Sequence, residues 1–257
     1  MAPYDIVGNI AIVKFKRGAS AREKKSTARD LLKQNKNLTT VLEKSNKFSG
    51  RLRIQKTKFI GGLKTREALY RENGCEFRLN VDTCYFSPRL ASERKELATI
   101  TKKGENVMVM FGGVGPFAIV IAKLSKAKRV VSVELNRECT KYAEMNVKRN
   151  KLGGRVEVVQ GDVRKKVPLL KDKFERIVMA RPNLKDSFLD VAFKDIKKNG
   201  IIHYYGFYPE EDVGELKDLI LREAKKAGKK IKIIKIKKAG DIGTRRYRYR
   251  ADILCLG

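Results

Sequence analysis

The stretch VMVMFGGVGPF, residues 107–117, joins a short apolar run to a glycine-rich turn and a second apolar segment. Such a run predicts a buried strand, and Pro116 predicts a helix that begins directly after the turn. Glycines at this position let the backbone approach a ligand closely, because they lack Cβ. The stretch therefore predicts a strand, a cofactor-binding loop and a helix, an arrangement that nucleotide-dependent dehydrogenases share.

Short apolar strands alternate with helical segments from this stretch to the end of the chain. This rhythm is typical of a sheet of parallel strands that helices cover on both faces. We expect strands at residues 107–111, 129–134, 156–160, 176–180, 200–207, 230–236 and 248–256. Seven strands in this pattern predict an α/β fold with the Rossmann-like sheet of a class I methyltransferase.

Two further strands are predicted to end on acidic residues, Glu134 and Asp162. A carboxylate after the second strand can accept hydrogen bonds from both hydroxyls of a ribose, in methyltransferases and dehydrogenases alike. The acid after the third strand favours S-adenosylmethionine, whose adenine amino group it can bind. Glu134 could instead be a solvated strand end, and Asp162 could be a helix N-cap. The predicted cofactor site comprises Phe111, Gly113, Gly115, Glu134, Leu135, Asp162, Val163 and Ala180.

Ala180-Arg181-Pro182 follows the fourth predicted strand of this sheet. Methyltransferases that act on exocyclic amino groups commonly have Asn or Asp, any residue and Pro here, and the first side chain accepts a hydrogen bond from the amine. Alanine has no such acceptor. The substitution favours methylation of a ring nitrogen or a carbon atom.

The first part of the chain predicts a smaller α+β domain over residues 1–102, followed by the methyltransferase domain over residues 103–257. We expect a strand at residues 6–15 that Gly8 interrupts, a charged helix at 20–33, and strands at 39–42 and 75–81. Pro88 predicts a helix that runs to about residue 102. The smaller domain is expected to bind RNA and to contribute to the active site.

The chain is strongly basic, with 59 Lys and Arg against 29 Asp and Glu and a formal net charge of +30. This excess favours a polyanionic partner, although a heat-adapted composition also raises the lysine content. Four cysteines without metal-site spacing and a single histidine predict no metal. The chain has no long apolar run and no export signal, so we expect no membrane, a cytoplasmic location and a monomer.

Several motifs resemble the archaeal-type tRNA guanine-37 N1-methyltransferases and their wyosine-forming relatives, over nearly the whole chain. They are FSGRLR at 48–53, ENGCEF at 72–77, YFSPRL at 85–90 with Glu93 and Arg94, and the loop at 110–117. Members that make only 1-methylguanosine usually have Asn-X-Pro where this chain has Ala180-Arg181-Pro182. The alanine resembles the branch that also methylates carbon 7 of 4-demethylwyosine to give isowyosine.

The resemblance implies roles for individual residues. Glu93 is the expected base for the guanine N1 proton, and Arg53 the contact to guanine O6 or a phosphate. Arg94 is expected to hold the carboxylate of the methionyl group, Tyr85 to stack near the target base, and Pro182 to shape the catalytic site. The implied partner is the anticodon loop of tRNA, in particular tRNA-Phe.

Two other functions fit parts of the sequence. A related aminocarboxypropyl transferase uses the same cofactor and donates its other arm to the wyosine precursor. A non-catalytic RNA-binding protein could retain the scaffold and use the alternating Tyr247-Arg248-Tyr249-Arg250 segment to contact bases and phosphates. The intact glycine loop, Glu134 and Asp162 favour an enzyme. His203, in the predicted strand at 200–207, is expected to be a structural histidine.

Overall fold

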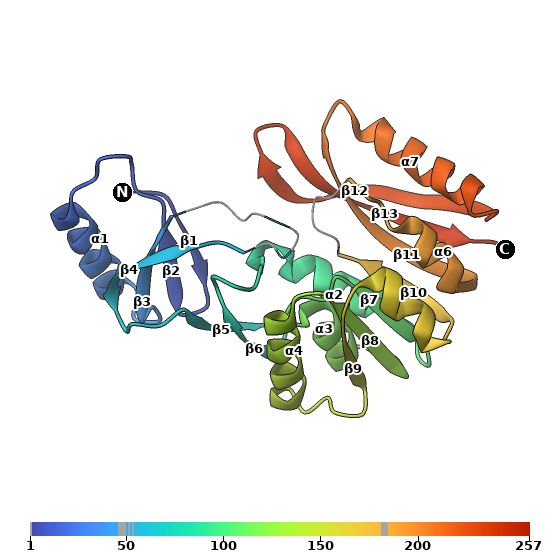
Figure 1. Ribbon diagram of the computed structural model, residues 1–257, viewed down its shortest axis with the longest axis horizontal. Helices are drawn as coiled ribbons and strands as arrows, with labels where there is room; N and C mark the ends of the chain where they lie inside the picture. The colour runs from blue at the N-terminus through green and yellow to red at the C-terminus, as the bar shows by residue number, and fades with distance from the viewer. Residues whose placement is uncertain (1, 46–49, 51, 53, 181–184) are drawn as a thin grey trace. The chain divides into compact units, whose positions relative to one another are not determined.

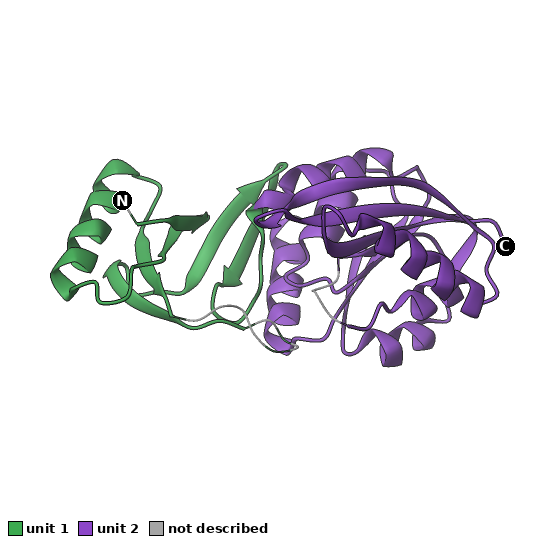
Figure 2. Cartoon of the chain, turned by 90° about the horizontal axis from the view of Figure 1, so that it is seen from above, with its two compact units in different colours: residues 1–88 green, residues 89–257 purple. Residues whose placement is uncertain are grey.

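The computed structural model describes residues 2–45, 50, 52, 54–180 and 185–257. The chain forms two compact units, Met1–Pro88 and Arg89–Gly257, which Figure 2 colours separately. The sequence places the division near residue 102, whereas the contacts divide the chain before helix α2 (Ala91–Ile100). The reason is that α2 packs against helix α3 (Pro116–Leu124) of the second unit.

The first unit contains a four-stranded sheet in the order β1-β2-β3-β4, one helix, and a separate hairpin (Figure 1). The expected single strand at residues 6–15 is two antiparallel strands, because the chain turns at Gly8, whose φ is +57°. A Cβ on Gly8 would lie 2.0 Å from the Leu69 carbonyl oxygen, so this turn requires glycine. The elements are β1 Tyr4–Val7, β2 Ile10–Val13, α1 Ala21–Gln34, β3 Thr40–Lys44, β4 Thr57–Gly62, β5 Glu67–Glu72 and β6 Cys75–Asn80.

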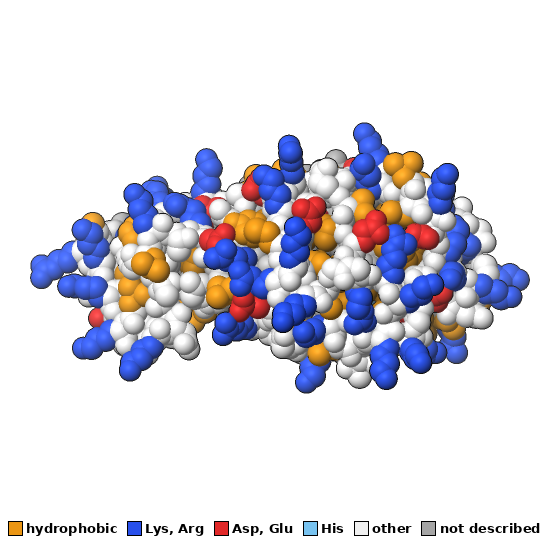
Figure 3. All heavy atoms as spheres, turned by 90° about the horizontal axis from the view of Figure 1, so that it is seen from below, with side chains coloured by type: hydrophobic (Ala, Val, Ile, Leu, Met, Phe, Trp, Pro, Cys, Tyr) orange, Lys and Arg blue, Asp and Glu red, His pale blue; other side chains and the backbone are white. Residues whose placement is uncertain are grey.

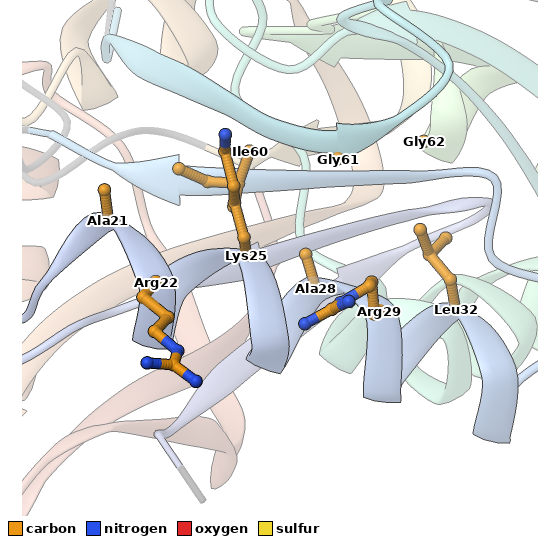
Figure 4. A pocket seen from close by; sticks show the side chains of 9 residues that line it. All are labelled: Ala21, Arg22, Lys25, Ala28, Arg29, Leu32, Ile60, Gly61 and Gly62. Carbon is orange, nitrogen blue, oxygen red and sulfur yellow. The ribbon is translucent and has the colours of Figure 1, made fainter.

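Helix α1 begins with a capping box, in which Ser20 accepts from the backbone of Glu23 and the Glu23 side chain accepts from the backbone of Ser20. It buries Ala28 and Leu31 against the sheet. A groove of about 570 Å³ lies between α1 and β4 (Figure 4). Apolar residues and basic side chains line this groove: Ala21, Arg22, Lys25, Ala28, Arg29, Leu32, Ile60, Gly61 and Gly62.

The second unit is built on a seven-stranded sheet in the order β12-β13-β11-β10-β7-β8-β9. Strands β11, β10, β7, β8 and β9 run parallel, and β13 pairs antiparallel with both β11 and β12. The strands are β7 Asn106–Met110, β8 Arg129–Glu134, β9 Val156–Gln160, β10 Phe174–Met179, β11 Ile196–Pro209, β12 Ile231–Gly243 and β13 Arg246–Cys255. The predicted fold, a class I seven-stranded sheet with a smaller N-terminal α+β domain, is confirmed.

Helices cover both faces of this sheet. Helices α2, α3 and α4 (Arg137–Arg149) pack on one face, and α5 (Val163–Lys166), α6 (Leu189–Asp195) and α7 (Val213–Lys226) lie on the other. Short 3-10 turns span Pro88–Leu90 and Val167–Leu170. The α6 and α7 face is closed by a large apolar core, to which β10, β11 and β13 contribute alternate residues.

None of the helices that the structure describes is long and apolar enough to cross a membrane. Among the same residues, no group of three or more His, Cys, Asp or Glu side chains lies in position to hold a metal ion.

Candidate active site

The glycine loop turns sharply between β7 and α3. Phe111, Gly113 and Gly115 all adopt positive φ, at +62°, +56° and +88°. Gly115 is the N-cap of α3, and Pro116 begins the helix, where its missing N–H costs no hydrogen bond. This backbone leaves the loop at the carboxyl end of a central parallel strand, the edge at which α/β sheets bind ligands.

Glu134 fastens this loop to the end of β8. Its Oε2 accepts from the Gly113 backbone N–H at 2.8 Å, and its Oε1 accepts from the Asn136 N–H at 2.7 Å. Burial raises the pKa of the Glu134 carboxyl, and the two N–H donors oppose that rise. Each carboxylate oxygen can accept more than one hydrogen bond, so Glu134 retains the capacity to bind two ribose hydroxyls.

The neighbouring strand β9 brings Asp162 to the same edge. Asp162 is the N-cap of α5, and its side chain accepts from the Arg164 N–H at 2.9 Å. The N-cap alternative is thus present in the structure. Leu135 is half-buried beside Glu134, and Val163 is buried at the start of α5. Strands β7, β8 and β9 are adjacent, so the sheet gathers the predicted cofactor residues from three strand ends.

Two further predicted cofactor residues follow the adjacent strands β7 and β10. Phe111 packs its ring against Phe188 at 5.1 Å between centroids, and Ala180 is half-buried directly after β10. Arg53 and Pro182 lie outside the described residues. Tyr85 belongs to the first unit, where its side chain is 36% exposed, and its stacking on the target base stays a prediction.

Glu93 lies on α2 and is only 5% exposed. Its Oε2 accepts from Arg250 Nη1 at 2.8 Å and from the Tyr205 hydroxyl at 3.0 Å, and its Oε1 lies 2.5 Å from Lys237 Nζ. Arg250 and Lys237 also bind Glu96, one turn further along α2. The carboxylate that the resemblance names as the base is therefore held by two cations and a phenol.

Arg94 is buried beside the helix of the cofactor loop. Its guanidinium lies over the Phe117 ring at 5.7 Å, and the Tyr205 ring lies 5.9 Å from Phe117 on the same face of the sheet. Phe117 is the second residue of α3, directly after the loop. The structure thus brings Arg94 and the Glu93 cluster to the helix that carries the cofactor loop.

Ion pairs continue from Arg250 across three strands beneath α2. Arg250 Nε binds Asp252 Oδ1 at 2.9 Å, and the same oxygen lies 2.6 Å from His203 Nδ1. His203 Nε2 lies 2.6 Å from Arg176 Nη1, and Arg176 Nε binds Glu105 Oε2 at 2.7 Å. Both arginines are 1% exposed, so their charges depend on these partners. We call these side chains, together with Glu93, Glu96, Tyr205 and Lys237, the buried ion network.

No sequence pattern indicated a function for Asp252, Arg176 or Tyr205. Arg250 had a role only in the non-catalytic alternative, as part of the Tyr247–Arg250 segment, and His203 was expected to be structural. A signal was present, because a charged residue in the middle of an otherwise buried strand must find a partner. Arg250, in the Tyr247–Arg250 segment, is such a residue. Tyr249 faces the apolar core, whereas Arg250 faces α2, so neither side chain is available to stack on a base.

The comparisons with known proteins agree with the fold. Residues 68–235 match the profile of the TRM5/TYW2 methyltransferase domain. The chain is 36% identical to tRNA (guanine(37)-N(1))-methyltransferase Trm5b of Pyrococcus abyssi, over 97% of this chain and 73% of the relative. The crystal structure of that Trm5b superimposes with a TM-score of 0.88, at 35% identity, over 99% of this chain and 75% of the other.

A second relative is tRNA (guanine(37)-N(1))/4-demethylwyosine(37)-methyltransferase Taw22 of Nanoarchaeum equitans. It is 32% identical over 97% of this chain and 98% of the relative. Fold and site together define a class I methyltransferase that uses S-adenosylmethionine, which confirms the predicted cofactor. The chain belongs to the TRM5/TYW2 methyltransferase family, as the sequence motifs predicted.

The contact between Gly112 and Ser132 provides a test of the loop. A Cβ on residue 112 would lie 2.1 Å from Ser132 Oγ but 3.4 Å from Ser132 Cβ. Gly112→Ala should therefore lower the free energy of unfolding by about 1–3 kcal/mol through overcrowding. Because Ser132 Oγ has no hydrogen-bond partner among the described residues, Ser132→Ala should be nearly neutral and should restore most of the loss in the double variant. Urea unfolding of the wild type, the two single variants and the double variant measures this effect. If the two single losses simply add in the double variant, the contact between residues 112 and 132 is contradicted.

The His203 contacts predict a pH dependence of stability. Arginine can only donate, so His203 Nε2 accepts from Arg176 and Nδ1 carries the proton toward Asp252. Burial, with smaller effects of Arg176 and Arg250, holds the pKa of His203 below its ordinary value. The unfolded chain then binds a proton below about pH 6.5 that the folded chain binds less readily. The contribution of His203 to the free energy of unfolding is complete above about pH 6.5. It falls as the pH drops below that value, by at most about 1.4 kcal/mol per pH unit.

Urea unfolding at closely spaced pH values between 7 and 5.5 measures this slope. His203→Asn should be less stable at pH 7 and should lose the His-dependent part of the slope. An unchanged slope in His203→Asn would contradict the assigned protonation state.

Proposed function

We propose that this protein methylates N1 of the guanine at position 37 of tRNA, and that it also methylates carbon 7 of 4-demethylwyosine at the same position. The observation that carries the proposal is the match of nearly the whole chain to relatives of both kinds. Trm5b of Pyrococcus abyssi is named for guanine-37 N1-methylation, and Taw22 of Nanoarchaeum equitans for that reaction and the one on 4-demethylwyosine.

The side chains around the loop suit the first reaction. Bound S-adenosylmethionine supplies an electrophilic methyl group. The methyl group would pass from the sulfonium of the cofactor to N1 of guanine, and Glu93 would accept the proton that N1 loses. Arg94, whose guanidinium lies over Phe117, is proposed to bind the methionyl carboxylate, and Glu134, which holds the Gly113 N–H, is proposed to bind the ribose. Arg53 is proposed to contact O6 or a phosphate, Tyr85 to stack near the base, and Pro182 to shape the target pocket.

Ala180 supports the second reaction. It stands at the end of β10, next to β7 and the cofactor loop, where amine-directed enzymes have a hydrogen-bonding side chain. A methyl side chain leaves room for the larger tricyclic base and accepts no hydrogen bond from an amine.

A basic surface at the same edge of the sheet supports a tRNA partner. Strand β11 runs parallel to β10 and β7, and it continues past the edge that carries the cofactor loop to end at Pro209. Pro209 pairs with Arg246, and the turn of the β12–β13 hairpin exposes Arg245 and Arg246 there. Lys and Arg side chains are spread over the face in Figure 3 and outnumber the Asp and Glu side chains there. This charge suits a phosphate backbone, and we propose the anticodon loop, in particular of tRNA-Phe, as the partner of a monomer in the cytoplasm.

The test is to incubate the protein with two tRNAs, one with guanine and one with 4-demethylwyosine at position 37. S-adenosylmethionine is labelled separately in its methyl and carboxypropyl groups, and mass spectrometry identifies the nucleoside at position 37. We expect 1-methylguanosine from the first tRNA and isowyosine from the second, each with the methyl label.

The other outcomes are distinct. Product from the first tRNA alone would contradict the second activity, and transfer of the carboxypropyl label would identify an aminocarboxypropyl transferase. Binding of tRNA without any transfer would favour a non-catalytic RNA-binding protein. A tRNA with adenine at position 37 serves as the control for the modified position.

A further inference from the structure

The Glu93 carboxylate faces an unusual environment for a proton acceptor, because it is buried and both its oxygens are in use. A buried carboxylate without a cation would be strongly destabilised in its charged form. Arg250, Lys237 and the Tyr205 hydroxyl offset that cost. Each of the three comes from a different strand, so the sheet fixes the position of the carboxylate as well as its charge.

We propose that Arg250 is a positioning residue for Glu93, which keeps the carboxylate ionised and oriented for proton transfer. The inference rests on the proposed function, in which Glu93 is the base. Arg250 is suited to this role because its guanidinium binds three carboxylates, those of Glu93, Glu96 and Asp252. Asp252 holds it from the strand side through Nε, and this leaves Nη1 directed at Glu93.

The charges of the network fit the uptake of one proton. Its charged and titratable groups, by element, are Glu93 and Glu96 on α2, Glu105 before β7, Arg176 on β10, His203 and Tyr205 on β11, Lys237 on β12, and Arg250 and Asp252 on β13. Four carboxylates thus face three cations, with His203 neutral and Tyr205 a phenol. The network carries one negative charge in excess, so a proton from the substrate leaves it neutral.

Tyr205 contributes as a donor only. Burial, together with the charge of Glu93, raises the pKa of its phenol well above the ordinary value. The hydroxyl therefore keeps its proton and stabilises the ionised form of Glu93. Lys237, with a side chain 22% exposed, is the more solvated of the two cations, so Arg250 should have the larger effect on Glu93.

The experiment is a pH profile of single-turnover methyl transfer to tRNA with guanine at position 37, at saturating cofactor and tRNA. In Arg250→Met, the acidic limb of the profile should move to higher pH by about one to three units, because the buried carboxylate has lost a cation. The limiting rate should fall, while the dissociation constants for tRNA and S-adenosylmethionine stay within about twofold. Arg250→Lys, which keeps a cation, should shift the acidic limb less than Arg250→Met does.

Arg176→Met is the matched control. Arg176 is as buried as Arg250 and also bridges two groups of the network, but it reaches Glu93 only through His203, Asp252 and Arg250. This variant should lose stability without moving the acidic limb. Equal profiles for wild type and Arg250→Met, or equal shifts for both arginine variants, would overturn the proposal.

Tyr205→Phe provides a second route if Arg250→Met does not fold. It removes one hydroxyl and should move the acidic limb in the same direction by a smaller amount, and an unmoved limb would count against the proposal. Wild type is measured first. If wild type transfers no methyl group, the proposed function fails, whereas an active wild type with unshifted variants refutes the role of Arg250 alone.

Discussion

The hydrogen bonds of Glu134 connect the two strands on which the site depends. One carboxylate holds the N–H of Gly113 in the loop after β7 and the N–H of Asn136 after β8. Asn136 in turn caps helix α4, where its side chain accepts from Glu138 and Cys139. The loop, the end of β8 and the start of α4 are therefore fixed by a single pair of residues. The same carboxylate lies at the sheet edge where a ribose would bind, so the site is organised before any ligand enters.

The buried ion network places a second constraint on the opposite side of the same loop. Buried charges cost several kcal/mol each unless they are paired, and breaking such a pair costs about 3–5 kcal/mol. Glu93 and Glu96 can pair with Arg250 only when α2 lies over β13 in one orientation. The network therefore selects the position of α2 on the sheet, and α2 also carries Arg94. This links the geometry of the cofactor loop to that of the proposed base.

The strands of the second unit could be located from the sequence, because an apolar, β-branched run that ends on Gly or an acidic residue is a local signal. It predicted residues 129–134 and 156–160 as observed. It missed the ends of two longer strands, because β12 continues beyond its apolar part to Gly243 and β11 extends on both sides of the predicted 200–207. It merged β1 and β2, since one glycine inside an apolar run indicates a bulge as readily as a hairpin. The predicted cofactor residues could be named from sequence because each lies at or just after the end of a strand with a clear local pattern.

The network around Glu93 could not be predicted in the same way. Its members come from positions 93, 96, 105, 176, 203, 205, 237, 250 and 252. Only the register of β10, β11, β12 and β13 brings the strand residues among them to one face. For example, His203 pairs with Asp252 because their strands are in register, which no local pattern encodes. Sequence reasoning therefore named Glu93 from a resemblance but not the side chains that hold it.

The most direct test of the central claim is calorimetric titration of S-adenosylmethionine into the wild type, Glu134→Ala and Glu157→Gln. Glu157 lies near the start of the adjacent strand β9 and pairs with Arg129 at the surface, so it controls for loss of a carboxylate on these strands away from the proposed site. The account predicts that Glu134→Ala binds at least about tenfold more weakly, a loss of about 1.4 kcal/mol, and that Glu157→Gln binds as the wild type does. Equal affinities for all three proteins would contradict the assignment of this sheet edge as the cofactor site.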